Sequence, residues 1–251
     1  MRVLARPEPV MLDLRRLARR GGLSTLRLES DGAQLHSSVL SGADIESLRL
    51  SADQLVEGQP GARLRNCPAV IDAASADGPL GRIATRVLRG KARPVRAVMF
   101  DKTSANNWRV GWHQDRTIAV RKRLPAPGFG PWSTKAGVVH VEPPFELISR
   151  MVTLRAHLDE CDEDNAPLLI AVGSHALGKT PARDAADVAH RLGVAQCLAI
   201  TGDVWVYSTS ILHASEPAVR PRRRRVLQVD YTSRELPYGL DWAGIAEASP
   251  P

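Results

Sequence analysis

Residues 151–158 read Met-Val-Thr-Leu-Arg-Ala-His-Leu, and polar and apolar side chains alternate along them. Thr153, Arg155 and His157 share one face of an extended strand, whereas the residues between them share the other. This two-residue period predicts a β-strand with one polar and one apolar face. The segment therefore points to a β-sheet core, and the flanking sequence supports that interpretation.

Other short apolar or alternating runs in the second half of the chain predict further strands. Pro, Gly and Asp clusters bound most of these runs, which is typical of strands in a sheet. They cover residues 95–100, 168–172, 197–200, 204–207 and 226–231.

Helical patterns dominate residues 1–94, where apolar stripes predict helices over 10–18 and 79–88. Ser51 and Gln54 resemble a capping box before a short helix, and another stripe ends at Gly193. Helices followed by many short strands predict an α+β domain whose core is a β-sandwich or open barrel.

The prolines at 125, 127, 131, 143 and 144 fall within residues 122–147. We expect this segment to be a long loop, and ordered loops of that length often cover active sites.

The chain has 251 residues and a net charge of +7, from 34 Lys and Arg against 27 Asp and Glu. A basic balance suits an anionic substrate or nucleic acid, although an Arg-rich composition produces the same balance without either. The three cysteines match no metal-binding spacing and fit the reduced thiols of a cytoplasmic protein. No apolar run reaches roughly 18 residues, so we expect no transmembrane helix.

The segment Gly111-Trp-His-Gln-Asp115 carries the strongest chemical signal. His113 and Asp115 are two residues apart, so an extended chain points both to one side. A second histidine would complete the two-histidine, one-carboxylate triad that suits non-haem Fe(II) and leaves positions open. His213, which follows the predicted strand 204–207, is the best candidate. A hydrogen-bonded pair at a strand end is the alternative for His113 and Asp115.

Residues 222–225 are four consecutive arginines that lead into the last predicted strand. The planar guanidinium of an arginine can pair with a carboxylate through two hydrogen bonds. Ser215 lies two residues after His213 and could supply a hydroxyl to the same carboxylate.

With these residues in view, the sequence resembles the phytanoyl-CoA dioxygenase family of Fe(II)/2-oxoglutarate oxygenases. Ala166 stands where that family usually has Gly, and Val172 where it has Pro. The likeness covers about residues 95–235 and is carried by 112–115, 152–160, 165–175, the segment His213-Ala-Ser-Glu-Pro, and Arg224.

The resemblance implies a single oxygenase domain over 1–251, with a double-stranded β-helix (jelly-roll, cupin-like) core over 95–235 and N-terminal and flanking helices. The region 1–94 would be mainly helical, and 122–147 would form a loop at the active site.

The resemblance also implies the roles of the site residues. Iron would be bound by His113, Asp115 and His213. The co-substrate 2-oxoglutarate would be bound by Arg224 and Ser215, with Arg222 and Arg225 as alternative anchors, and by Arg155, Thr153 and Gln114. A surface position is the alternative for Arg155.

The implied activity is the hydroxylation of an unactivated C–H bond of a small molecule, which consumes O2 and releases succinate and CO2. Amino-acid derivatives, natural products and acyl compounds are the expected substrate classes, and basic residues near the motif suggest an anionic one. The candidate substrate contacts are Trp112, Arg116, Phe129, Trp132 and Lys102.

Two other functions compete with this one. The same chemistry could act on a protein or a nucleic acid, although the chain lacks the interleaved aromatic residues that stack on single strands. A non-catalytic cupin-like binding protein is the other alternative, but it would not need two histidines, a carboxylate and an arginine anchor together.

Overall fold

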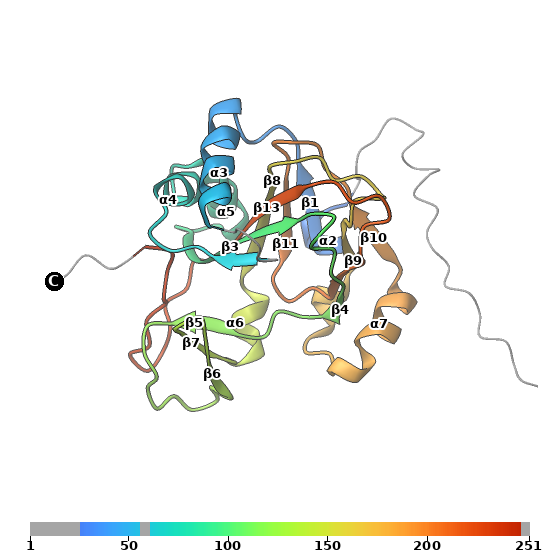
Figure 1. Cartoon of the computed structure of the whole chain (residues 1–251). Helices are drawn as coiled ribbons and strands as arrows, with labels where there is room; N and C mark the ends of the chain where they lie inside the picture. The colour runs from blue at the N-terminus through green and yellow to red at the C-terminus, as the bar shows by residue number, and fades with distance from the viewer. Residues whose placement is uncertain (1–25, 56–60, 247–251) are drawn as a thin grey trace, which may run out of the picture.

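The computed structural model describes residues 26–55 and 61–246, which fold as a mixture of α-helices and antiparallel β-sheets (Figure 1). The largest sheet has six strands, in the order β1 (Ala33–His36), β11 (Val204–Ser208), β8 (Val152–His157), β13 (Arg224–Thr232), β3 (Arg93–Lys102) and β2 (Gly61–Arg63). The second sheet has four strands, in the order β10 (Val194–Cys197), β9 (Leu168–Ala171), β12 (His213–Ser215) and β4 (Val110–His113).

Three helices cover one face of the six-stranded sheet: α3 (Gly42–Leu55), α4 (Pro68–Ala74) and α5 (Pro79–Leu88) (Figure 1). Leu154 and Ala156 of β8 pack against this helical layer, as the alternation in 151–158 predicts. The stripe over 79–88 is confirmed as α5, with Pro79 in its first turn, where the missing N–H costs nothing.

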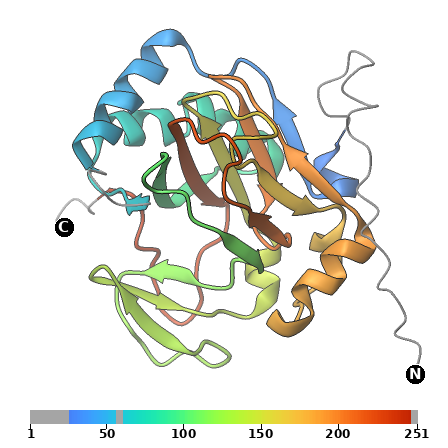
Figure 2. The same cartoon turned by 45° about the vertical axis from the view of Figure 1, so that its right-hand side comes forward.

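The opposite face of the six-stranded sheet looks toward the four-stranded sheet (Figure 2). Trp205 and Tyr207 of β11 pack there against Leu168 and Ile170 of β9. Because β-strand side chains alternate, polar residues of β8, β13 and β3 also lie on this inner face, and several of them line a cavity.

A third sheet corrects the expectation of a long loop over residues 122–147. β6 (Trp132–Lys135) and β7 (Val138–Val141) form a hairpin, and β7 also pairs with β5 (Ile118–Val120). Val141 and Ile118 contribute to an apolar cluster with Trp242. The prolines mark the ends of the hairpin, where strand pairing needs no backbone N–H.

The other strand predictions are confirmed within a few residues, except that 197–200 lies at the end of β10 and beyond it. The helical stripe predicted to end at Gly193 is α7 (Ala185–Leu192), and Gly193 follows its last residue. The shorter helices are α2 (Leu28–Asp31), α6 (Phe145–Ser149) and the 3₁₀ turns 174–177 and 182–184.

Two features of the N-terminal region differ from the prediction. β1 and β2 form the two edges of the six-stranded sheet, so the region is not only helical. Ser51 lies inside α3 and donates a hydrogen bond to the Ser47 carbonyl, so it caps no new helix. The helix predicted over 10–18 lies outside the described residues. No helix in the described part of the chain is both long and apolar enough to cross a bilayer.

Candidate active site

A cavity of about 830 Å³ lies between the two larger sheets. β3, β4, β8, β12 and β13 all contribute to its wall. Seven of the residues predicted for the site line this cavity: His113, Asp115, His213, Ser215, Arg155, Arg224 and Lys102. Residues more than a hundred positions apart are thus brought together.

The two histidines face each other across the β4–β12 pair. His113 and His213 are direct partners in the register, and their ring centroids are 4.2 Å apart. The Nδ1–H of His113 donates to the Gly111 carbonyl (2.8 Å), and that of His213 donates to the Ile211 carbonyl (3.0 Å). These bonds fix the tautomer and leave each Nε2 with its lone pair.

Burial keeps His213 neutral. Removal from water and the nearby charge of His113 lower the pKa of His213 to about 4, although Asp115 acts in the opposite direction. A neutral imidazole is the form that binds metal.

Asp115 is held by a mostly buried arginine that no sequence motif indicates. Arg96 donates through Nη2 to Asp115 Oδ2 (3.0 Å) and through Nε to Asp230. Burial raises the pKa of Asp115, but Arg96 above all, together with His213 and His113, lowers it by more, so the net shift is downward. Asp115 is therefore an ionised acceptor at neutral pH.

The other end of the cavity holds buried cations with no acidic partner in the part of the chain that the structure describes. Arg224 and Arg155 are 2% and 7% exposed, and the Nε of each has no hydrogen-bond partner. Arg224 contacts Cys161 Sγ at 3.9 Å, and Arg155 donates to Gln228 Oε1 at 3.2 Å. Within the described residues, neither forms an ion pair. Burying an unpaired charge is costly, so this end of the cavity is built to receive an anion.

Lys102 adds a third cation beside Arg224, its register partner on β3. Its Nζ donates to the Ser215 hydroxyl (3.1 Å) and to the carbonyls of Trp108 and Glu216. Burial and the charges of Arg224 and Arg155 lower the pKa of Lys102 to about 8.

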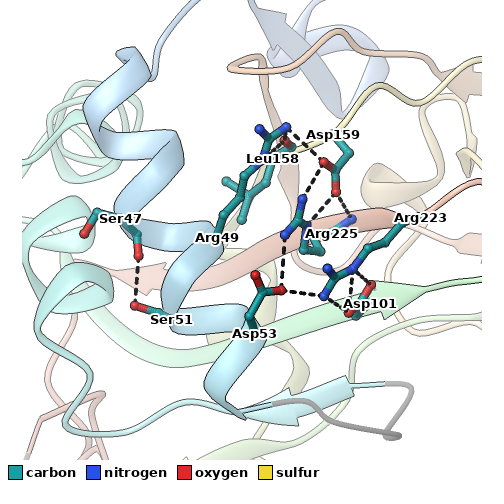
Figure 3. A network of polar contacts seen from close by, with 9 residues as sticks. All are labelled: Ser47, Arg49, Ser51, Asp53, Asp101, Leu158, Asp159, Arg223 and Arg225. Carbon is teal, nitrogen blue, oxygen red and sulfur yellow. Dashed lines mark hydrogen bonds and ion pairs between the residues drawn. The ribbon is translucent and has the colours of Figure 1, made fainter.

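The structure distinguishes the arginines of the 222–225 run. Arg224 faces the cavity, whereas Arg223 and Arg225 point outward and pair with Asp101, Asp53 and Asp159 (Figure 3). Arg222 is also on the surface, paired with Asp162. Only Arg224 among the four lines the cavity.

The sequence profile described as phytanoyl-CoA dioxygenase (PhyH) matches residues 28–226, most of the chain. The chain belongs to the phytanoyl-CoA dioxygenase family. It is therefore an enzyme of the 2-oxoglutarate-dependent oxygenase class. Among curated proteins, no sequence matches the chain.

Solved structures share the fold of this family member at low sequence identity. Apo EctD from S. alaskensis is 16% identical, with 88% of this chain and 79% of EctD covered and a TM-score of 0.62. AviO1 from Streptomyces viridochromogenes is 19% identical, with 84% and 94% covered and a TM-score of 0.60. HygX from Streptomyces hygroscopicus, solved with nickel, 2-oxoglutarate and hygromycin B, is 16% identical, with 88% and 94% covered and a TM-score of 0.57.

Several residues predicted for the dioxygenase site lie outside the cavity wall. Gln114 is buried and binds the backbone of Gly178, Ser210 and Thr180. Thr153 contacts Thr209 and Asp230. Both side chains therefore brace the region around the site and do not line it.

The predicted substrate contacts are also placed elsewhere, with the exception of Lys102. Trp112 packs against the α7 side of β4, because it alternates with His113. Arg116 donates to the Thr180 carbonyl. Phe129 and Trp132 pack in the apolar cluster of the third sheet.

The described residues contain no group of three His, Cys, Asp or Glu side chains already drawn together as a metal site. The donor chemistry nevertheless fits a divalent iron. Two imidazoles that donate through Nδ1 keep Nε2 free, and one ionised carboxylate lines the same cavity. The unpartnered Nε of Arg224 fits the distal carboxylate of 2-oxoglutarate equally well.

Proposed function

We propose that this chain is an Fe(II)/2-oxoglutarate-dependent hydroxylase of a small molecule. His113, Asp115 and His213 would hold the iron, and Arg224, Lys102 and Ser215 would hold the distal carboxylate of 2-oxoglutarate. The proposal depends on one observation: a single cavity contains both a two-histidine, one-carboxylate donor set and a buried arginine that has no counter-ion among residues 26–55 and 61–246.

We further propose that the core is a double-stranded β-helix. The order β11-β8-β13-β3 in one sheet and β10-β9-β12-β4 in the other supports this, because the chain passes between the sheets in the alternating manner of a jelly roll. The donors sit on β4, on β12 and just after β4, at one end of this core.

The bound iron would supply the oxidising chemistry, in which O2 is consumed and 2-oxoglutarate becomes succinate and CO2. The protein contributes binding and orientation. The Nδ1–H bonds of the histidines fix the ring planes, and Arg96 keeps one oxygen of Asp115 engaged. Ser215 accepts from Lys102 and lies beside the place proposed for the carboxylate.

Relatives support a small-molecule substrate. EctD was solved with 5-hydroxyectoine and HygX with hygromycin B, and both bind their small molecules together with 2-oxoglutarate. A cavity of about 830 Å³ lies within the size range of small-molecule sites. We propose an amino-acid derivative, a natural product or an acyl compound for this chain.

The function is tested by succinate formation. Purified protein with Fe(II), O2 and 2-oxoglutarate should release succinate slowly alone and faster with a matching substrate. Asp115→Ala should abolish both rates, whereas Asp184→Ala, which changes an exposed carboxylate of an ordinary surface pair, should keep them. Full succinate release by Asp115→Ala would contradict the proposed iron site.

A further inference from the structure

β2 and the residues just after it place two arginines on the cavity wall. Arg63 and Arg65 line the cavity, whereas Leu64 between them is buried in the core beneath the helices. This alternation continues the sheet, because the Leu64 N–H donates to the Ala97 carbonyl of β3 (3.0 Å). Both arginines line the cavity and are exposed, so they lie where the cavity meets solvent.

Neither arginine has an acidic partner among the described residues. Some surface arginines elsewhere are paired, namely Arg220 with Asp164, Arg222 with Asp162, and Arg223 with Asp101. Burial and the charge of nearby Arg96 lower the pKa of Arg63. The carboxylates nearest to Arg96, those of Asp115 and Asp230, are already engaged by it.

These arginines lie away from the cations proposed for 2-oxoglutarate. Arg63 is the register partner of Val98, whereas Arg224 is the partner of Lys102 on the same strand β3. Four residues of strand separate the two pairs, or about 13 Å. The continuing register leads Arg65 toward Arg96, on the Asp115 side of the cavity.

We infer that the substrate carries an oxyanion group, and that Arg63 and Arg65 bind it at the mouth of the cavity. This inference rests on the proposed function and names its substrate class. Guanidinium groups suit carboxylate, phosphate and sulfate, which share planar or tetrahedral arrays of oxygen acceptors. The neighbouring wall is formed by Ala136 and Val138 of the β6–β7 hairpin, whose small side chains leave room for the rest of the molecule.

The test follows the arginine Nε–Hε signals of the ¹⁵N-labelled full-length protein by NMR. Inorganic phosphate, sulfate and acetate are titrated in separate arms, which distinguishes the three anions. The variants are Arg63→Gln with Arg65→Gln, Arg224→Gln, and the control Arg183→Gln with Arg191→Gln, which removes two exposed charges outside the cavity. Calorimetry with Zn(II) and 2-oxoglutarate is run on the same samples.

We expect at least one oxyanion to shift the Arg63 and Arg65 signals, and its affinity to fall tenfold or more in the Arg63/Arg65 variant alone. The affinity for 2-oxoglutarate should fall only in Arg224→Gln. Unchanged oxyanion affinity in the Arg63/Arg65 variant, or no oxyanion binding to the wild type, would overturn the inference. A third outcome separates the two proposals. If the Arg63/Arg65 variant loses the oxyanion site but even the wild type does not bind 2-oxoglutarate, the proposed function is refuted and the anion site stands.

Discussion

At the scale of single residues, Arg224 shows how position within a run decides chemistry. It is 2% exposed and forms no ion pair with any described residue, whereas its neighbour Arg223 is held by Asp101 and Asp53 on the surface. The strand alternation of β13 turns adjacent arginines to opposite sides. A charge run in a sequence can therefore contain one functional group among several structural ones.

Arg224→Gln should weaken 2-oxoglutarate binding by about 2–4 kcal/mol, or roughly 30- to 1000-fold, because a buried charged hydrogen bond is lost. Calorimetry of the Zn(II)-loaded protein measures this. Arg223→Gln is the matched control and should bind 2-oxoglutarate as the wild type does. Equal weakening in both variants would mean that overall charge, and not the buried anchor, sets the affinity.

The lowered pKa of Lys102 predicts that 2-oxoglutarate binding depends on pH. Its pKa is lowered to about 8, so the cation is present below that pH and is lost above it. The affinity for 2-oxoglutarate should therefore fall as the pH rises through about 8. Lys102→Arg should remain charged and flatten the profile between pH 7 and 9, since arginine titrates far higher. The same slope in wild type and Lys102→Arg would assign the pH effect to another group.

At the scale of elements, an ion-pair network joins α3 to the six-stranded sheet (Figure 3). Asp159 accepts from the backbone N–H and guanidinium of Arg225 and from Arg49, and its side chain is 15% exposed. Burial raises the pKa of Asp159, but these hydrogen bonds and charges lower it by a larger amount, so the net shift is downward.

Asp159→Asn should lower the free energy of unfolding by about 1–3 kcal/mol, because charged hydrogen bonds in a mostly buried site are weakened. The folded state binds the proton of Asp159 less readily than the unfolded state does. The contribution is therefore present above the ordinary aspartate pKa of 3.8 and is lost as the pH falls through the lower folded value. Urea unfolding at pH 7 and pH 3 measures both effects.

The control is Asp184→Asn, at an exposed pair 3.6 Å apart, which should change the free energy of unfolding by less than about 0.5 kcal/mol. If Asp184→Asn lowered the free energy of unfolding as much as Asp159→Asn does, the network would contribute no special stability.

The β6–β7 hairpin predicts a separable effect on substrate binding. Val138→Trp would fill part of the cavity next to Arg63 and Arg65. It should therefore reduce the stimulation of succinate release by substrate. The slow release without substrate should persist, because Val138 belongs to the three-stranded sheet, whereas the strands that carry His113, His213 and Arg224 belong to the two larger sheets. Lys135→Ala on the same hairpin is outside the cavity wall and serves as the control. Loss of the slow rate as well would show that the hairpin shapes the reaction centre itself.

At the scale of the whole molecule, local patterns predicted the parts of the fold that have clear periodicity. The alternation in 151–158 gave β8, and the spacing of His113 and Asp115 placed both on the cavity. The edge strands β1 and β2 are only four and three residues long, too short for a period to be visible. The prolines on either side of residues 132–141 favoured a loop prediction, so the hairpin there was not predicted.

Long-range contacts were beyond the sequence. Arg96 holds Asp230, a residue 134 positions away, and nothing local to either marks the pair. Trp112 and Gln114 flank His113 in the sequence but do not line the cavity. Neighbouring residues of an extended chain face opposite sides, so both side chains point away from the side that His113 faces. Arg63 and Arg65 carry no motif, and only the cavity reveals what they share.

The central claim is that His113, Asp115 and His213 hold iron that in turn binds 2-oxoglutarate. The most direct measurement is an anaerobic titration of the metal-free protein with Fe(II) and then 2-oxoglutarate, monitored for the weak visible metal-to-ligand charge-transfer band. The band should appear in the wild type, be absent in His213→Ala, and require far more 2-oxoglutarate in Arg224→Gln. A protein that binds Fe(II) but shows no band at saturating 2-oxoglutarate, or a His213→Ala variant with the full band, would contradict the account.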